Sequence, residues 1–107
     1  MEDWILNRLE EIKKRFKEIE ILMTKKEVIS NQSEMRKISK EYRNLEKVNN
    51  LWDEYNKISN ELEDTQEMIN SDEAEISELA KSESEILSKN LEHVFVELNQ
   101  ELIPNFF

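Results

Sequence analysis

Residues 35 to 69 read MRKISKEYRNLEKVNNLWDEYNKISNELEDTQEMI, and apolar or aromatic side chains return in it every three or four positions. This spacing places side chains on one face of an α-helix. The resulting seam consists of Met35, Ile38, Tyr42, Leu45, Val48, Trp52, Tyr55, Ile58, Leu62, Thr65 and Ile69. A helix over residues 32–69 would be about 55 Å long at 1.5 Å per residue, which exceeds a compact globule of this size.

Two further apolar stripes flank this helix. The upstream stripe predicts a helix over about residues 2–23 and consists of Ile5, Leu9, Ile12, Phe16, Ile19 and Leu22. The downstream stripe predicts a helix over about residues 72–103, ended by Pro104, and consists of Ile76, Leu79, Ile86, Leu87, Leu91, Val94, Leu98 and Leu102. Three helices are therefore expected.

The first connector is TKKEVISNQS at residues 24–33, where the apolar period breaks. Asn31 followed by Glu34 resembles a capping box and predicts the start of the long helix. Val28 and Ile29 are expected to pin the connector to the core. The connector is short, so the two helices that it joins should run antiparallel.

The second connector lies near Asn70, where the seam of the long helix stops. Asp72, with Glu75 three residues later, predicts the cap of the last helix. Together the two connectors predict an all-α fold: an elongated antiparallel three-helix bundle, or coiled-coil-like arm, forming a single domain over residues 1–107. A long parallel dimeric coiled coil is the weaker alternative because both connectors would interrupt it.

The composition agrees with helices and argues against chemistry. The chain has no glycine, no cysteine and one proline, with 37% charged and 37% hydrophobic residues. Phosphate-binding loops need glycine, and nucleophilic or metal sites need several convergent ligands. The one histidine, His93, is expected at the edge of the bundle without a role. We therefore expect no enzyme activity, no cofactor and no metal site.

Charge is distributed unevenly along the chain. Residues 1–47 carry twelve Lys or Arg against ten Asp or Glu, a net +2, whereas residues 48–107 carry three against fifteen, a net −12. Near the first connector lie Lys25, Lys26, Arg36, Lys37, Lys40 and Arg43. This end could meet an anionic partner, although the favoured explanation is that the charges merely keep the domain soluble. Independent nucleic-acid binding is not expected of so acidic a chain.

The start MEDWILNRLEEIKKR is acidic before it is apolar and shows no signal peptide. No stretch approaches the roughly 20 apolar residues of a membrane span. Together with the absence of cysteine, these features favour the cytoplasm and no membrane partner.

Two segments carry a resemblance to a known family: EVISNQ at 27–32 and RKISKEYRNL at 36–45. They are similar to the first connector and second helix at the start of the bacterial peptide chain release factor 1 family, of class I. The likeness continues more loosely through TQEMINSDEAEISELAKSE at 65–83 and QELIP at 100–104. It departs afterwards, since the family continues into a lysine-aspartate-proline segment where this chain reads Asn105, Phe106 and Phe107.

The resemblance implies translation termination. A full-length factor of this family enters the ribosome, reads a stop codon and triggers hydrolysis of peptidyl-tRNA. Those tasks belong to later domains with a codon-reading tripeptide and a glycine-glycine-glutamine loop, which this chain lacks. The first domain of the family is a helical arm that docks near the stalk base of the large subunit. With the charge map, this makes Lys25, Lys26, Arg36 and Lys37 the expected ribosome-facing residues.

A second hypothesis is a free-standing coiled-coil adaptor or scaffold whose seam belongs to an intermolecular bundle. Helical periodicity is common to both hypotheses, and the SKEY segment at 39–42 favours the release factor. Molar mass in solution separates them. A release-factor arm should be a monomer or associate weakly, whereas a scaffold should form a stable dimer that unfolds on dilution.

Overall fold

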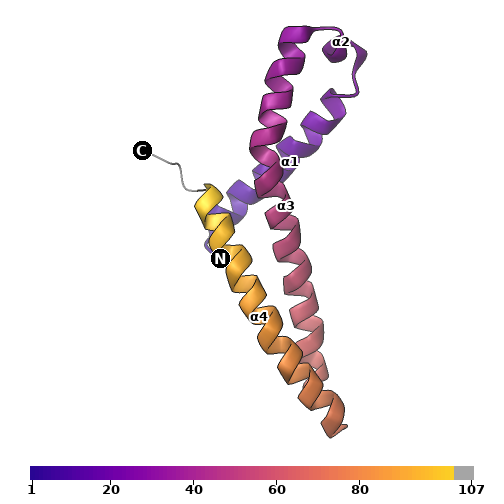
Figure 1. Cartoon of the computed structure of the whole chain (residues 1–107), viewed down its shortest axis with the longest axis vertical. Coiled ribbons are helices and arrows are strands. Elements are labelled where there is room, and N and C mark those ends of the chain that lie inside the picture. The colour runs from indigo at the N-terminus through magenta and orange to yellow at the C-terminus, as the bar shows by residue number, and fades with distance from the viewer. Residues whose placement is uncertain (103–107) are drawn as a thin grey trace. The chain divides into compact units, whose positions relative to one another are not determined.

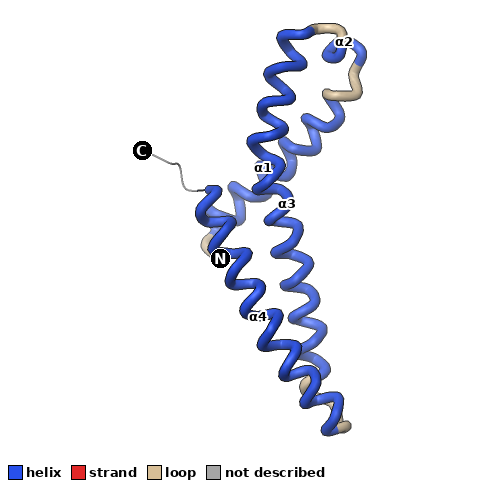
Figure 2. The backbone as a smooth tube through the Cα atoms, viewed as in Figure 1, coloured by secondary structure: helices blue, strands red, loops and turns tan. Residues whose placement is uncertain are grey.

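The structure is a computed structural model and describes residues 1–102. It contains four helices in this part of the chain: α1 at Asp3–Leu22, α2 at Lys26–Ile29, α3 at Gln32–Met68 and α4 at Ala74–Leu102 (Figure 1). Only helices, turns and loops occur over residues 1–102, as Figure 2 shows. The all-α prediction is confirmed. None of these helices is long and apolar enough to cross a membrane.

The contacts divide the chain into two compact units, and each is described by itself. Unit 1 runs from Met1 to Asn50 and holds α1, α2 and the first part of α3. Unit 2 begins at Leu51 and holds the second part of α3 and α4. The single domain over residues 1–107 stays a prediction. The expected helix end at Pro104 lies outside the described residues.

Unit 1 is built on the predicted apolar stripe of α1. All of its members except the half-buried Leu22 are buried: Ile5, Leu9, Ile12, Phe16 and Ile19. The Phe16 ring stacks on the Tyr42 ring of α3, with centroids 4.8 Å apart and planes at 27°. Aromatic pairs in this offset range add to the free energy of burial. The stripe spacing therefore identified the face of α1 correctly.

The start of α3 also follows the prediction. The Asn31 carbonyl accepts a hydrogen bond from the Met35 N–H at 2.9 Å, which opens the helix. The Asn31 side-chain Oδ1 accepts another from the Glu34 N–H at 3.2 Å. Asn31 thus satisfies one of the N–H groups that the first turn of a helix leaves without a partner.

Within unit 2, α3 and α4 form an antiparallel hairpin. Trp52 is buried and stacks on Tyr55, with centroids 5.6 Å apart, and Tyr55 lies 6.3 Å from the Phe95 ring of α4. At the turn, the Ser77 Oγ donates a hydrogen bond to the Ile69 carbonyl at 2.7 Å. Aromatic packing and this turn contact join the two helices.

The cap predicted for α4 was wrong by one residue. The helix begins at Ala74, and the first intrahelical bond runs from the Ser77 N–H to the Glu73 carbonyl at 3.0 Å. Glu73, not Asp72, therefore takes the capping position. Ser71 precedes it and accepts a hydrogen bond from the Glu73 N–H through its Oγ at 3.2 Å.

The buried face of α4 also differs from the prediction. Ile76, Leu79 and Ile86 were assigned to the core, but all three are exposed. The buried residues are Ala80, Leu87, Val94 and Leu98. Ala80, Leu87 and Val94 recur every seven residues. Leu98 ends a second series with the same spacing, in which Ser77, Ser84 and Leu91 are half-buried. In the first part of α4, small side chains therefore occupy the inward positions. Each of the larger residues Ile76, Leu79 and Ile86 stands one position before an inward residue and is exposed.

Candidate functional site

The candidate site lies in unit 1, where α1 passes through a short connector into α3. Helix α1 ends with the Met23 N–H bonded to the Ile19 carbonyl at 2.9 Å and the Thr24 Oγ bonded to the Ile21 carbonyl at 2.6 Å. The connector then forms α2, a single helical turn that the sequence pattern does not indicate. A four-residue helix has too few apolar positions to show a period.

The four predicted ribosome-facing residues all lie at this connector. Lys25 precedes α2, Lys26 opens it, and Arg36 and Lys37 lie in the second turn of α3. All four side chains are exposed. The structure thus leaves four cations accessible to a partner at one end of unit 1.

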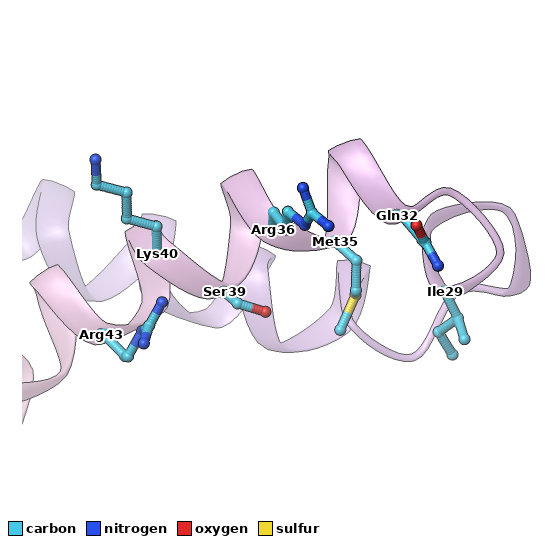
Figure 3. A pocket seen from close by; sticks show the side chains of 7 residues that line it. All are labelled: Ile29, Gln32, Met35, Arg36, Ser39, Lys40 and Arg43. Atoms are coloured by element: carbon cyan, nitrogen blue, oxygen red, sulfur yellow. The ribbon is translucent and has the colours of Figure 1, made fainter.

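An open groove of about 590 Å³ runs along α3 beside the connector (Figure 3). Its walls are Ile29, Gln32, Met35, Arg36, Ser39, Lys40 and Arg43. Of the four predicted residues, only Arg36 lines it. Ile29 was expected to pin the connector to the core, but it is 55% exposed and borders the groove, while Val28 is half-buried as expected.

We define the basic groove by five of these residues: Ile29, Met35, Arg36, Lys40 and Arg43. Its three cations are spaced by four and three positions, which places them along one face of α3. Neither Arg36 nor Lys40 has an acidic residue three or four positions away. In the described part of the chain, the three cations take part in no ion pair. Arg43 has Glu46 three positions on, so it is the charge of Arg36 and Lys40 that α3 leaves uncompensated.

The nearby carboxylate of Glu41 is directed to α1 instead. Arg15 donates from Nε to Glu41 Oε2 at 2.6 Å and from Nη2 to Oε1 at 2.8 Å. This hydrogen bonding from Arg15 lowers the pKa of Glu41, and burial opposes the shift. The same pair raises the pKa of Arg15. Glu41 thus fixes α1 against α3.

Over residues 1–102, no three His, Cys, Asp or Glu side chains gather as they would around a metal ion. His93 is exposed on α4, where its Nε2 lies 2.7 Å from Oε1 of Glu97, four positions on. The basic groove, which combines cations with apolar side chains, suits binding through charge and apolar contact.

Four residues of the basic groove are not among the predicted site residues: Ile29, Met35, Lys40 and Arg43. Lys40 and Arg43 had been counted among the basic residues of the connector. Lys40 and Arg43 follow Arg36 by four and seven positions, and this spacing indicates from the sequence that the three cations share one face of a helix. Ile29 and Met35 carried no such signal, because apolar residues at helical spacing usually indicate core.

Comparison with known proteins gives one family. The PCRF domain model matches residues 12–106. Peptide chain release factor 1 of Buchnera aphidicola subsp. Acyrthosiphon pisum is 33% identical over 104 residues, covering 97% of this chain and 28% of that protein. The protein of the same name from Solidesulfovibrio magneticus is 33% identical over 97 residues, 91% of this chain and 27% of its own length.

A third protein of that name, from Thermus thermophilus, is 29% identical over 100 residues, covering 94% of this chain and 28% of its own length. This chain therefore spans little more than a quarter of the length of these relatives. No solved structure shows a significant match to it.

Proposed function

This chain belongs to the PCRF domain family, and we propose that it acts as the ribosome-associating helical arm of a translation termination factor. The observation that carries the proposal is the family match over residues 12–106, together with relatives named peptide chain release factor 1 over 91% to 97% of the chain. The full-length factor would recognise stop codons and trigger hydrolysis of peptidyl-tRNA.

In this proposal the connector end of unit 1 faces the large ribosomal subunit near its stalk base. Support comes from Lys25, Lys26, Arg36 and Lys37, which are exposed at one end of the unit. Clustered cations steer a protein toward an anionic surface and raise its association rate. The ribosome, rich in phosphate, presents such a surface.

We also propose that this chain has no catalytic activity of its own. It has neither glycine nor cysteine, and its one histidine is exposed beside Glu97. Codon reading and hydrolysis would belong to other parts of a release factor. With the proposed role in translation, we expect the protein in the cytoplasm.

An exchange of segments tests the proposal. Residues 12–106 would replace the matching segment of a bacterial release factor 1, and a second variant of that factor would lack the segment. Association with stop-codon ribosome complexes would be followed by stopped-flow fluorescence. We expect the exchanged factor to associate faster than the shortened one and to release peptide. Association no faster than that of the shortened factor would contradict the proposal.

A further inference from the structure

One face of α4 carries large apolar side chains that unit 2 leaves exposed. Ile76, Leu79 and Ile86 are 39%, 70% and 55% exposed. Glu75 and Glu83 are exposed too, and each stands four positions from Leu79, so they share its face. We call these five residues the acidic stripe.

The charge of the acidic stripe is not compensated within α4. Neither Glu75 nor Glu83 has Lys or Arg three or four positions away. The cation in this part of the helix, Lys81, instead lies 3.7 Å from Glu78. A helix normally gains stability when opposite charges stand at these spacings. Here both acids remain available to another surface.

The basic groove of unit 1 is the complement of the acidic stripe. The stripe exposes Leu79 and Ile86, and the groove offers the exposed Ile29 beside the half-buried Met35. Glu75 and Glu83 on one side, and Arg36 and Lys40 on the other, have no opposite charge three or four positions away on their own helices. Their lengths also agree. At 1.5 Å per residue, Ile76 to Ile86 spans about 15 Å, and the wall of the open groove on α3, from Gln32 to Arg43, spans about 17 Å. A helical face can therefore lie along the groove over its whole length.

We propose that the acidic stripe of one copy of this chain binds in the basic groove of a second copy. Leu79 and Ile86 would cover the apolar side chains Ile29 and Met35, while Glu75 and Glu83 face Arg36, Lys40 and Arg43. The contact joins two different surfaces, so each folded copy offers one acidic stripe and one basic groove. Such an apolar helical face in a groove is a common mode of recognition.

The association is weak and depends on salt. The charges on both surfaces are solvent-exposed, so added ions screen their attraction within about 10 Å at 0.1 M ionic strength. Each copy stays folded when the contact opens, because neither surface contributes to the buried cores of the units. Dilution therefore yields folded monomers.

Sedimentation velocity on the whole chain over a range of concentrations tests the proposal. We expect the average mass to rise with concentration at low salt, and the rise to diminish at about 0.5 M salt, where the Debye length is only a few Å. Lys40→Glu in the groove or Glu83→Lys in the stripe should each raise the dissociation constant by about tenfold or more. A monomer at every concentration would overturn the proposal.

Mixing the two variants gives the sharpest outcome. In a mixture of K40E and E83K, the altered groove faces an altered stripe of opposite charge, and the unaltered groove faces an unaltered stripe. Association should return although neither variant associates alone. The matched controls are Lys37→Glu on α3 and Glu61→Lys, both exposed and outside the two surfaces. No recovery in the mixture, or equal loss in the controls, would overturn the proposal.

Discussion

The Arg15 guanidinium of α1 binds both carboxylate oxygens of Glu41 on α3, with Nε 2.6 Å from Oε2 and Nη2 2.8 Å from Oε1. Two parallel bonds of this kind fix geometry more firmly than a single contact. The side chains are 42% and 38% exposed, so water screens the pair. Its main effect is to set the register of the two helices beside the Phe16 and Tyr42 stack.

Glu41→Gln should lower the free energy of unfolding by about 0.2–1 kcal/mol at neutral pH, the range typical of solvent-exposed ion pairs. Hydrogen bonding from Arg15 lowers the pKa of Glu41 in the folded chain. The pair therefore stabilises the fold above the ordinary glutamate pKa of about 4.3, and this contribution is lost as pH falls through the lowered pKa.

Urea denaturation at neutral pH and at successively lower pH measures this effect. The difference between the parent chain and E41Q should shrink on acidification. Glu20→Gln is a suitable control, since Glu20 is an exposed residue of α1 whose neighbours at three and four positions carry no cation except Lys17. A difference that stays constant with pH would show that the ion pair is not its source.

The Asn31 cap is a second local determinant. Asn31→Ala removes the acceptor for the Glu34 N–H and should cost about 1 kcal/mol of stability. Asn31→Asp should retain most of this stability, because the Asp carboxylate accepts the same hydrogen bond from the Glu34 N–H. Asn44→Ala, at an exposed position inside the same helix, should be neutral or slightly stabilising. Thermal melts followed by circular dichroism test this order, and equal effects of N31A and N44A would disprove it.

The phase of α4 can be tested with two adjacent residues. Leu87 is 6% exposed and Ile86 is 55% exposed. Leu87→Ala should cost about 2–4 kcal/mol, because it opens a cavity in a packed core. Ile86→Ala should change stability by no more than about 0.5 kcal/mol, as is usual for surface positions. If the two variants lose equal stability in urea denaturation, the buried face of α4 is not the one that contains Leu87.

Trp52 anchors unit 2 beside Tyr55. Trp52→Ala should cost about 3 kcal/mol or more, since it removes a large buried ring. Leu45→Ala should lower the free energy of unfolding by less, because Leu45 on the same seam is only half-buried. Chemical denaturation of both variants checks the order. An unaffected W52A chain would refute the burial of this face of α3.

The sequence predicted α1 and α3 well because each has one dominant apolar stripe. Every seam residue of α3 from Met35 to Thr65, and Ile69 just after the helix, is buried or half-buried. Helix α4 has two adjacent stripes near its start, and helical spacing alone does not choose between them. Residues Leu87, Leu91, Val94 and Leu98 fix the phase. Counting back by sevens from Leu87 and Leu91 reaches Ala80, Ser84 and Ser77, the inward positions.

The candidate site was predicted only in part, for a physical reason. Counts of charge along the chain located the basic end of unit 1, but they do not show which cations share a face with a groove. Whether Ile29 packs inward or borders that groove depends on α2, whose single turn leaves no periodic signal. Arg36 alone belongs to both the predicted set and the groove.

Binding to large ribosomal subunits is the most direct test of the proposed function. A variant with Lys25, Lys26, Arg36 and Lys37 changed to Glu would be compared with one carrying the same changes at four other exposed lysines, namely Lys14, Lys17, Lys57 and Lys89. The two variants have equal net charge. In stopped-flow measurements within a full-length release factor, the connector variant should associate more slowly than the control, most clearly at low salt. Equal association rates for the two variants would contradict the account.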